Sequence, residues 1–327
     1  MDILGDTLQA IWRGVTARGP NLFTGRSSRS ETLILFFNTM WDQHIDLDGV
    51  ELPTGYRLTT DVRRFADAAS VVFHIPSLNE LPAHKPEGQL WVAWSMECEV
   101  NYPQLRDPGF MWQFDLSMTY RLDADVVVAY TSYYGDVANL ARALRTRPAP
   151  KTRDKLASLF ISSGLNRSGR MEYAEELMRY LDVHSYGKVL RNRQIMGRDR
   201  NRPTKLDIIA DYKFDLSFEN ATAEDYVTEK FFDPLVAGVV PVYLGAPNVE
   251  RFAPGDRCFI NTADFQGPKE LAEYLMHLDH DDSAYAAYFS WKERPFRPAF
   301  RALLAGQEVP SFARLCQVVQ TRRGQQR

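Results

Sequence analysis

YKFDLSFENATAEDYVTEKFFDPLVAGVVPVYLG, residues 212–245, is the stretch that decides the fold. Within it, Lys213–Phe218 alternates polar and apolar side chains almost to its end, which is typical of a partly buried strand. The polar run Glu219–Asp225 interrupts that period. Val239–Leu244 is a continuous apolar run, which is typical of a parallel strand covered on both faces. The stretch therefore predicts two parallel strands with a helix between them.

The predicted helix begins within the polar run. Thr222 and Asp225 are three residues apart and fit a capping box at its start. Pro234 is expected to weaken or bend the helix, and Gly238 is suited to end it. An apolar stripe at helical spacing is formed by Val227, Phe231, Leu235 and Val236. Strand, helix and strand together predict a β-α-β unit.

Polar residues gather where the first strand ends and the helix starts. Ligands of β-α-β units bind at this edge, where free amides and the positive end of the helix dipole attract phosphate. Lys230 can place a positive charge against a pyrophosphate, whereas Glu229, an acceptor, suits ribose hydroxyls. The alternative is that both are ordinary solvated helix residues. The polar residues near this edge are Glu219, Asn220, Tyr226, Glu229 and Lys230.

The remainder of the chain contains no internal repeat and is divided by its pattern. Residues 1 to about 30 predict a helical lead-in, and the proline-rich segment 145–152 is the best linker. The sequence thus predicts α/β domains over residues 1–148 and 149–327, with the tail from about residue 289 packing back on the first. Strands expected in the first domain are Leu33–Phe37, Val71–Ile75, Leu90–Trp94 and Val126–Ala129.

Several segments, in order along the chain, resemble the motifs of the α1,3-fucosyltransferases of glycosyltransferase family 10. FENATAEDYVTEK followed by AGVVPVYLGAPNVERFAP is similar to the family's signature. WSMECEVNY, residues 94–102, resembles its segment ending in Glu-Ser-Pro, and MTYRLDADVVVAY, residues 118–130, resembles its SYR-D-SD stretch. Residues 162–192 resemble its arginine-bearing helix and D-SYG element. The resemblance covers roughly residues 70–320.

This resemblance implies a fold and a reaction. The implied fold is GT-B, in which two Rossmann-like domains, the first binding acceptor and the second binding GDP-fucose, face a central cleft. The implied reaction is an inverting transfer of fucose to a sugar hydroxyl. DYVTEKFF and GAPNVERFAP resemble plant-type enzymes that fucosylate the N-glycan core more than enzymes that make Lewis antigens, which favours O3 of an N-acetylglucosamine in a chitobiose or N-glycan core as the acceptor.

Inversion requires a base beside the acceptor hydroxyl, and Glu97 is the candidate. It follows the apolar run LWVAW at a strand end and matches the glutamate of the family's Glu-Ser-Pro. Cys98 and Glu99 replace the serine and proline of that motif, so the loop has its own shape. Glu99 is the nearest competitor for the role, and a solvated glutamate at a strand end is the structural alternative.

The departing GDP needs fixed donors for its developing negative charge, and Arg167 and Lys230 are the candidates. Arg167 matches the family's donor-binding arginine, and its planar group can bind two phosphate oxygens. Arg170 is a weaker candidate one helical turn later. The resemblance further implies that Asn220 and Tyr226 hydrogen-bond the diphosphate or fucose, and that Glu229 binds the ribose.

No metal site and no required cofactor are expected. Asp123-Ala124-Asp125 has the Asp-x-Asp form of a metal chelate, but a turn before the strand that follows accounts for it. The histidines and cysteines have no zinc-ligand spacing, so a divalent metal is expected to be at most stimulatory. The basic run 191–205 lacks interleaved aromatic residues and is expected to be a solvated loop.

Composition limits the other partners. The formal net charge of -3 argues against a general nucleic-acid binder. No apolar run is long enough to predict a transmembrane helix, and the first residues lack a signal-peptide pattern. Three cysteines suit a reducing compartment. The expectation is a bacterial cytoplasmic protein. Attachment to a membrane surface, and removal of a native anchor by truncation, are left open.

Three functions remain open at this point. The first is fucosylation of a core-type N-acetylglucosamine, and the second is a Lewis-type reaction on N-acetyllactosamine. The third is a non-catalytic glycan-binding protein of the same fold, suggested by the altered loop after Glu97.

Overall fold

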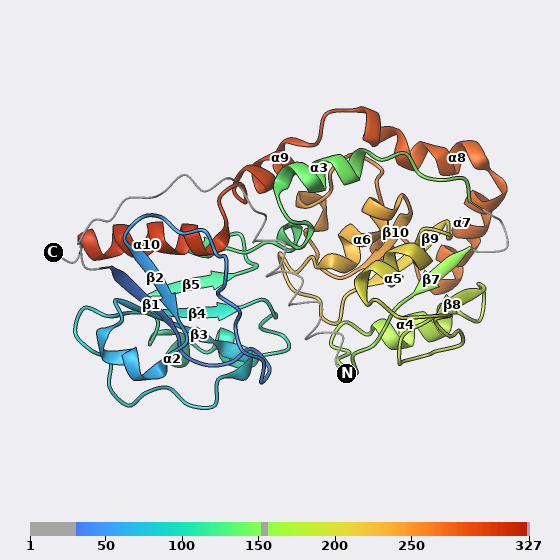
Figure 1. Cartoon of the computed structure of the whole chain (residues 1–327). Helices are drawn as coiled ribbons and strands as arrows, with labels where there is room; N and C mark the ends of the chain where they lie inside the picture. Colours follow the sequence, from blue (N-terminus) through green and yellow to red (C-terminus); the bar gives the residue numbers. More distant parts are fainter. Residues whose placement is uncertain (1–30, 152–155, 326–327) are drawn as a thin grey trace. The chain divides into compact units, whose positions relative to one another are not determined.

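The computed structural model describes residues 31–151 and 156–325, so the predicted helical lead-in lies outside the described residues. The chain forms two compact units, shown in Figure 1. In the described part, the first unit comprises residues up to 136 together with 306–325, and the second comprises Val137–Ala305. The units divide at 136/137 and 305/306, whereas the sequence placed the boundary at 148 and the return at about 289.

The second unit is built on a five-stranded parallel sheet with the order β11-β10-β9-β7-β8. Alternate residues of β9 point to opposite faces. Phe214, Leu216 and Phe218 belong to the core shared with α4 and α7, while Asp215 lies on the face of α5 and α6. The strands are β7 Ala157–Leu159, β8 Val183–Ser185, β9 Phe214–Phe218, β10 Val240–Leu244 and β11 Ile260–Asn261. The helices are α3 Val137–Arg145, α4 Arg170–Leu177, α5 Arg202–Ile209, α6 Glu229–Ala237, α7 Pro268–His280, α8 Asp282–Ala286 and α9 Pro298–Ala305.

The predicted β-α-β unit is confirmed as β9, α6 and β10. The two strands pair in parallel from Phe214 opposite Val240 to Phe218 opposite Leu244. Pro234 lies inside α6, and Gly238 ends the helix with a φ of 71° in the left-handed region. Both features were expected at these positions.

The predicted capping box is wrong. α6 begins at Glu229, and its N-cap is Thr228, whose side chain accepts from the Lys230 amide. Asp225 instead exchanges two hydrogen bonds with Asn248, at 2.9 and 2.8 Å, and has a φ of 64°. This tie to the loop after β10 holds the segment before Thr228 outside the helix.

The first unit is built on a six-stranded parallel sheet with the order β2-β1-β3-β4-β5-β6. The strands expected in this half are present as β1, β3, β4 and β6. The strands are β1 Thr32–Phe36, β2 Tyr56–Thr59, β3 Ser70–His74, β4 Leu90–Ser95, β5 Leu116–Thr119 and β6 Val126–Val127. The only α-helices among the described residues of this unit are α2 Pro108–Met111 and α10 Ser311–Gln325.

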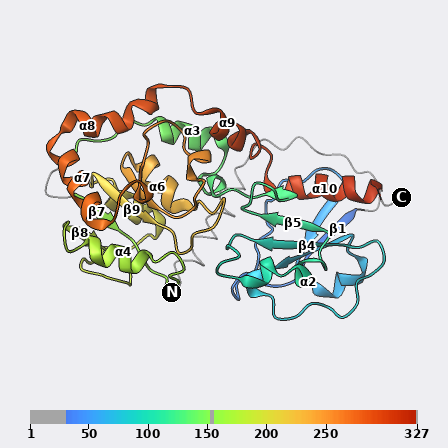
Figure 2. The same ribbon diagram turned by 180° about the vertical axis from the view of Figure 1, so that it is seen from behind.

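The C-terminal helix α10 packs on this first sheet, as both Figure 1 and the reverse view in Figure 2 show. The rings of Phe36 in β1 and Phe312 in α10 are 4.9 Å apart. Arg314 donates to the carbonyl of Val127 at 2.6 Å, and Arg322 pairs with Asp125 at 3.0 Å. The last helix of the chain is thereby joined to β1 and to the region of β6.

Both sheets have the same topology. In each, the strand that comes first along the chain lies between the second and the third, so that the connections leave it in opposite directions. Open parallel sheets bind ligands beyond the carboxyl ends of the strands at such a reversal. The fold thus marks two places, the ends of β7 and β9 in the second unit and the ends of β1 and β3 in the first.

In the part of the chain that the structure describes, no helix is long and apolar enough to cross a membrane. The three cysteines, Cys98, Cys258 and Cys316, are buried thiols.

Candidate active site

The reversal in the second sheet brings two predicted donor-binding residues together. The amide of Arg167, in the loop after β7, donates to the carbonyl of Asn220, just after β9, at 2.7 Å. Arg167 also forms a parallel bridge with Ala221, and the Ser168 hydroxyl donates to the carbonyl of Glu219 at 2.5 Å. Arg167 itself is exposed, whereas Asn220 is buried. The Arg167 side chain is therefore exposed, while the backbone that carries it is fixed by hydrogen bonds.

The buried side chain of Arg170 also holds the backbone of the loop after β7. Its side chain is 1% exposed and donates to the carbonyls of Ser163 and Leu165, both at 3.0 Å, and of Phe218 at 3.2 Å. One guanidinium thus joins the loop after β7 to the last residue of β9. Buried in this way, Arg170 is a positioning group for the loop that carries Arg167.

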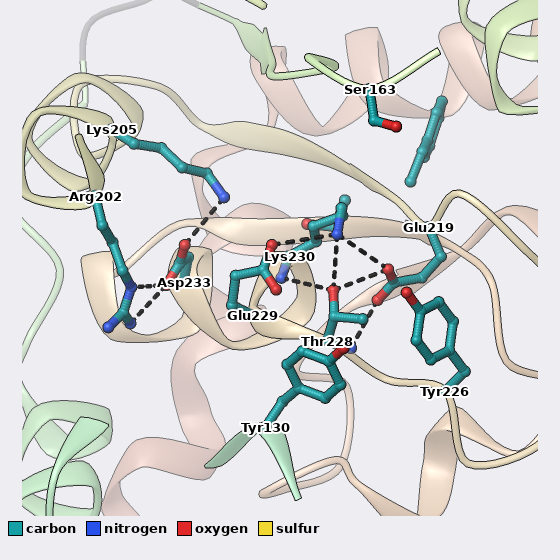
Figure 3. Close-up of polar contacts among 12 residues, drawn as sticks. Tyr130, Ser163, Arg202, Lys205, Glu219, Tyr226, Thr228, Glu229, Lys230 and Asp233 are labelled. Atoms are coloured by element: carbon teal, nitrogen blue, oxygen red, sulfur yellow. Dashed lines mark hydrogen bonds and ion pairs between the residues drawn. The ribbon is translucent and has the colours of Figure 1, made fainter. Parts of the chain in front are cut away.

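A compact polar cluster lies at the N-terminus of α6 (Figure 3). The carboxylate of Glu219 accepts from the amide of Thr228 at 2.7 Å and from its hydroxyl at 2.8 Å. The Lys230 ammonium lies 3.0 Å from the Thr228 hydroxyl, 3.2 Å from Glu229 and 3.4 Å from Glu219. The side chain of Glu219 is 0% exposed, that of Glu229 15% and that of Lys230 20%.

The cluster holds one positive and two negative charges. Burial lowers the pKa of Lys230, but attraction to Glu229 and Glu219 outweighs burial and raises it. Burial raises the pKa of Glu219, and Lys230 only partly offsets this. Lys230 therefore stays protonated, and its charge is already balanced by carboxylates before any ligand arrives.

A second ionic group joins α5 to α6 beside this cluster. Asp233 is buried and accepts from Arg202 at 2.7 Å and from Lys205 at 3.0 Å, as Figure 3 shows. Burial raises the pKa of Asp215 to about 6, while Lys205 and a hydrogen bond from Ser158 at 2.7 Å act in the opposite direction. The sequence did not indicate this group, because its members come from three separate elements.

Tyr226 lies beside Glu219 in Figure 3. Its side chain is buried, and its carbonyl accepts from the hydroxyl of Tyr243 at 3.3 Å. The structure thus gathers Asn220, Tyr226, Glu229 and Lys230 around the start of α6, together with Glu219 and Thr228, whose roles the sequence did not assign. Thr228 precedes Glu229 as a residue of the N-cap type, which is the signal that locates it.

In the first unit, Glu97 follows the carboxyl end of β4. Its side chain is 4% exposed, and the Asn101 amide donates to Oε2 at 3.4 Å. The Ser95 hydroxyl donates to the Glu97 carbonyl at 2.7 Å and accepts from its amide at 3.1 Å, which fixes the backbone there. The carboxylate is thus held at the edge of the sheet where ligands bind.

Glu99, the competing base, is occupied by cationic and hydroxyl partners. It accepts from Tyr120 at 2.5 Å and from Arg106 at 3.3 Å, and Arg121 lies 3.8 Å away. Burial raises its pKa, but these partners outweigh burial and hold the pKa below its usual value. A carboxylate stabilised in its charged form is a weaker proton acceptor, so the geometry favours Glu97.

The aspartates of Asp123-Ala124-Asp125 have separate protein partners. Asp123 pairs with Arg121 at 2.9 Å, and Asp125 accepts from the amide and hydroxyl of Ser117 and from Arg322. Across residues 31–151 and 156–325, no group of three or more histidine, cysteine, aspartate or glutamate side chains is arranged to hold a metal. In the basic run, Arg200 pairs with Asp207 and Arg202 with Asp233.

Comparison with known families assigns the chain to a family. Residues 29–131 match the family described as "Fucosyltransferase, N-terminal", and residues 150–327 match "Glycosyltransferase family 10 (fucosyltransferase) C-term". The chain belongs to glycosyltransferase family 10. The family resemblance stated from the motifs is thereby confirmed, and the matched regions contain every candidate residue named above.

Family 10 relatives with curated names are similar over much of the chain. The human "GDP-fucose protein O-fucosyltransferase 3" is 35% identical over 66% of this chain and 47% of that protein, so the chain spans about half the length of the first relatives it matches. The mouse "4-galactosyl-N-acetylglucosaminide 3-alpha-L-fucosyltransferase 9" is 31% identical over 81% of this chain and 72% of that protein.

The fold is also similar to that of a solved structure. A crystal structure of an alpha1,3-fucosyltransferase with GDP-fucose superimposes with a TM-score of 0.58 over 95% of both chains, at 17% sequence identity. The predicted GT-B class, with two parallel α/β units, is thereby confirmed at the level of fold.

Proposed function

We propose that the chain is an inverting α1,3-fucosyltransferase that moves fucose from GDP-fucose to O3 of an N-acetylglucosamine in a chitobiose or N-glycan core. One observation carries the proposal. At the reversal of the second sheet, the Arg167 amide is bonded to the carbonyl of Asn220 beside the N-terminus of α6, so that an exposed arginine and the positive end of a helix dipole gather at one edge.

In this proposal the second unit binds the nucleotide. Arg167 contributes the uncommitted positive charge, and Lys230 acts within its carboxylate cluster, because its ammonium is shared with Glu219 and Glu229. Asn220 and Tyr226 bind the diphosphate or fucose, and Glu229 binds the ribose. Fixed donors of this kind stabilise the charge that develops on the leaving diphosphate.

Glu97 is the proposed base of the first unit. It accepts the proton of the acceptor O3 while that oxygen attacks the fucose carbon and GDP leaves from the opposite side. The proposal requires no cofactor and gives a metal at most a stimulatory part, because Arg121, Ser117 and Arg322 already bind Asp123 and Asp125.

The names of the relatives supply two other acceptors. One is a galactosyl-N-acetylglucosaminide, the Lewis-type alternative, and the other is a protein hydroxyl. A non-catalytic glycan-binding protein is the remaining alternative.

The experiment is an acceptor panel with GDP-fucose, in which released GDP is measured and the product linkage and anomer are determined by NMR. The proposal expects an α1,3 product on a chitobiosyl glycan and none on N-acetyllactosamine or a peptide. Glu97→Gln should lower kcat by about 10²- to 10⁴-fold and leave GDP-fucose affinity unchanged. Glu99→Gln is the matched control and should keep more activity than Glu97→Gln. Equal turnover in wild type and Glu97→Gln would reject Glu97 as the base.

A further inference from the structure

The reversal in the first sheet holds a strained turn. Met40 and Gln43 exchange two backbone hydrogen bonds of 3.0 Å, and the two residues between them, Trp41 and Asp42, have φ values of 46° and 61°. Positive φ at both central positions defines a type I′ turn, which normally contains Asn-Gly. For other residues the left-handed conformation costs about 1–2 kcal/mol each, so the surroundings must hold the turn in place.

Contacts to the end of β3 hold Trp41. Its amide donates to the Ser77 hydroxyl at 2.7 Å, and its ring meets the ring of His74 edge-to-face at 4.7 Å. His74 in turn meets Trp94 of β4 at 5.0 Å. Burial lowers the pKa of His74 to about 3, so the imidazole is a neutral aromatic support. Trp41 is the outermost ring of this series and remains partly exposed.

The same series of rings leads toward the strand that carries the candidate base. Trp94, the ring that meets His74, lies in β4, three residues before Glu97. Burial is the larger cause that raises the pKa of the nearby Tyr102 hydroxyl, and the charge of Glu97 acts in the same direction. The side-chain amide of Asn101 donates to Glu97. The backbone amides of Asn101 and Tyr102 both donate to the carbonyl of Cys98 at 3.0 Å. The Asn101 amide and the backbone turn at Cys98 thus fix the loop that follows this carboxylate.

We propose that Trp41 is the acceptor platform, on which the apolar face of a hexopyranose ring packs so that its hydroxyl is directed to Glu97. This inference rests on the proposed function and deepens it, because it names the acceptor class as a sugar ring rather than a peptide hydroxyl. One face of a pyranose is covered by C–H groups and packs on an aromatic ring, as other apolar surfaces do. The Tyr102 hydroxyl and the Asn101 amide supply polar contacts at the rim.

The test measures binding and turnover separately. Saturation-transfer NMR with chitobiose reports contact between protein and sugar C–H groups without requiring catalysis. Trp41→Ala should remove this signal and raise the acceptor KM by about 10- to 30-fold, while the KM for GDP-fucose stays within about twofold. Trp41→Phe, which keeps a ring but loses the indole N–H, should give an intermediate KM. Asp42→Gly, which preserves the turn, should leave the acceptor KM unchanged.

The outcomes separate the two proposals. Binding of chitobiose through Trp41 without fucose transfer would remove the proposed function and keep the platform. Transfer to a sugar with an unchanged acceptor KM in both Trp41→Ala and Trp41→Phe would overturn the platform alone. Transfer to a peptide hydroxyl with no sugar signal, or an equal rise in both KM values, would also overturn it. Thermal unfolding of each variant identifies a loss caused by misfolding, and Trp41→Phe then decides.

Discussion

Replacing Lys230 by methionine tests the charge balance at the start of α6. The substitution leaves Glu219, which is fully buried, and Glu229, which is 15% exposed, without their shared cation at 3.4 and 3.2 Å. Removing one partner of a buried ion pair typically costs about 3–5 kcal/mol, and we expect Lys230→Met to lose that amount near pH 7. For a unit of this size, each kcal/mol lowers Tm by about 2–4 °C.

The sign of the pH dependence follows from the same contacts. Without the ammonium, burial and the charge of Glu229 raise the pKa of Glu219 in the folded protein further above about 4.3, the value in the unfolded chain. The folded state then binds more protons, so the lost stability should return as pH falls toward 4. Lys230→Met combined with Glu219→Gln should recover most of it at pH 7, because one of the two unpaired charges is gone.

Urea unfolding of the four members of this double-mutant cycle, followed by tryptophan fluorescence at several pH values, is the assay. Lys269→Met is the matched control, since Lys269 is exposed and lies 3.9 Å from Glu273, a pair expected to contribute less than about 1 kcal/mol. If Lys230→Met is as stable as Lys269→Met at pH 7, or if adding Glu219→Gln gives no recovery, the reasoning about the cluster is refuted.

Two further perturbations address the groups around this cluster. Arg170→Met should cost about 3 kcal/mol by removing three charged hydrogen bonds and should weaken GDP binding in a titration calorimeter, with the exposed Arg179→Met as control; unchanged GDP affinity would contradict its positioning role. Asp215 has a raised pKa of about 6, so its protonation stabilises the fold below about pH 4 and this contribution is lost as pH rises through 6. Asp215→Asn should therefore flatten the pH dependence of the unfolding free energy between about 4 and 6; an unaltered slope would contradict the assignment.

The strands and their parallel pairing could be predicted because the residue pattern within each segment is set by the surroundings of that segment alone. The apolar run in β10 reflects burial, and Gly238 is needed where the chain adopts a positive φ. The alternation in β9 located a strand but predicted partial burial, which is wrong, because Asp215 and Ser217 are buried too and Asp215 is hydrogen-bonded by Ser158. The helix start could not be placed, because Thr222 and Thr228 are both N-cap residues. Asn248, which lies 23 residues beyond Asp225, decides between them by a tertiary hydrogen bond.

The candidate site was predictable in part for a similar reason. Arg167, Asn220 and Lys230 could be identified because each lies within a segment that matches a motif of the family. The pairing of Lys230 with Glu219 could not be anticipated, because Glu219 follows β9 and contacts the first turn of α6 only in the folded chain. The turn at Trp41 carries no sequence signal, since a Trp-Asp pair is not a turn dipeptide.

A crystal structure with GDP tests the central claim most directly, namely that the reversal of the second sheet is the nucleotide site. The account expects the diphosphate beyond the carboxyl ends of β7 and β9, within hydrogen-bond distance of Arg167 and beside the start of α6. A diphosphate bound at the opposite ends of these strands, or remote from both Arg167 and Lys230, would contradict it.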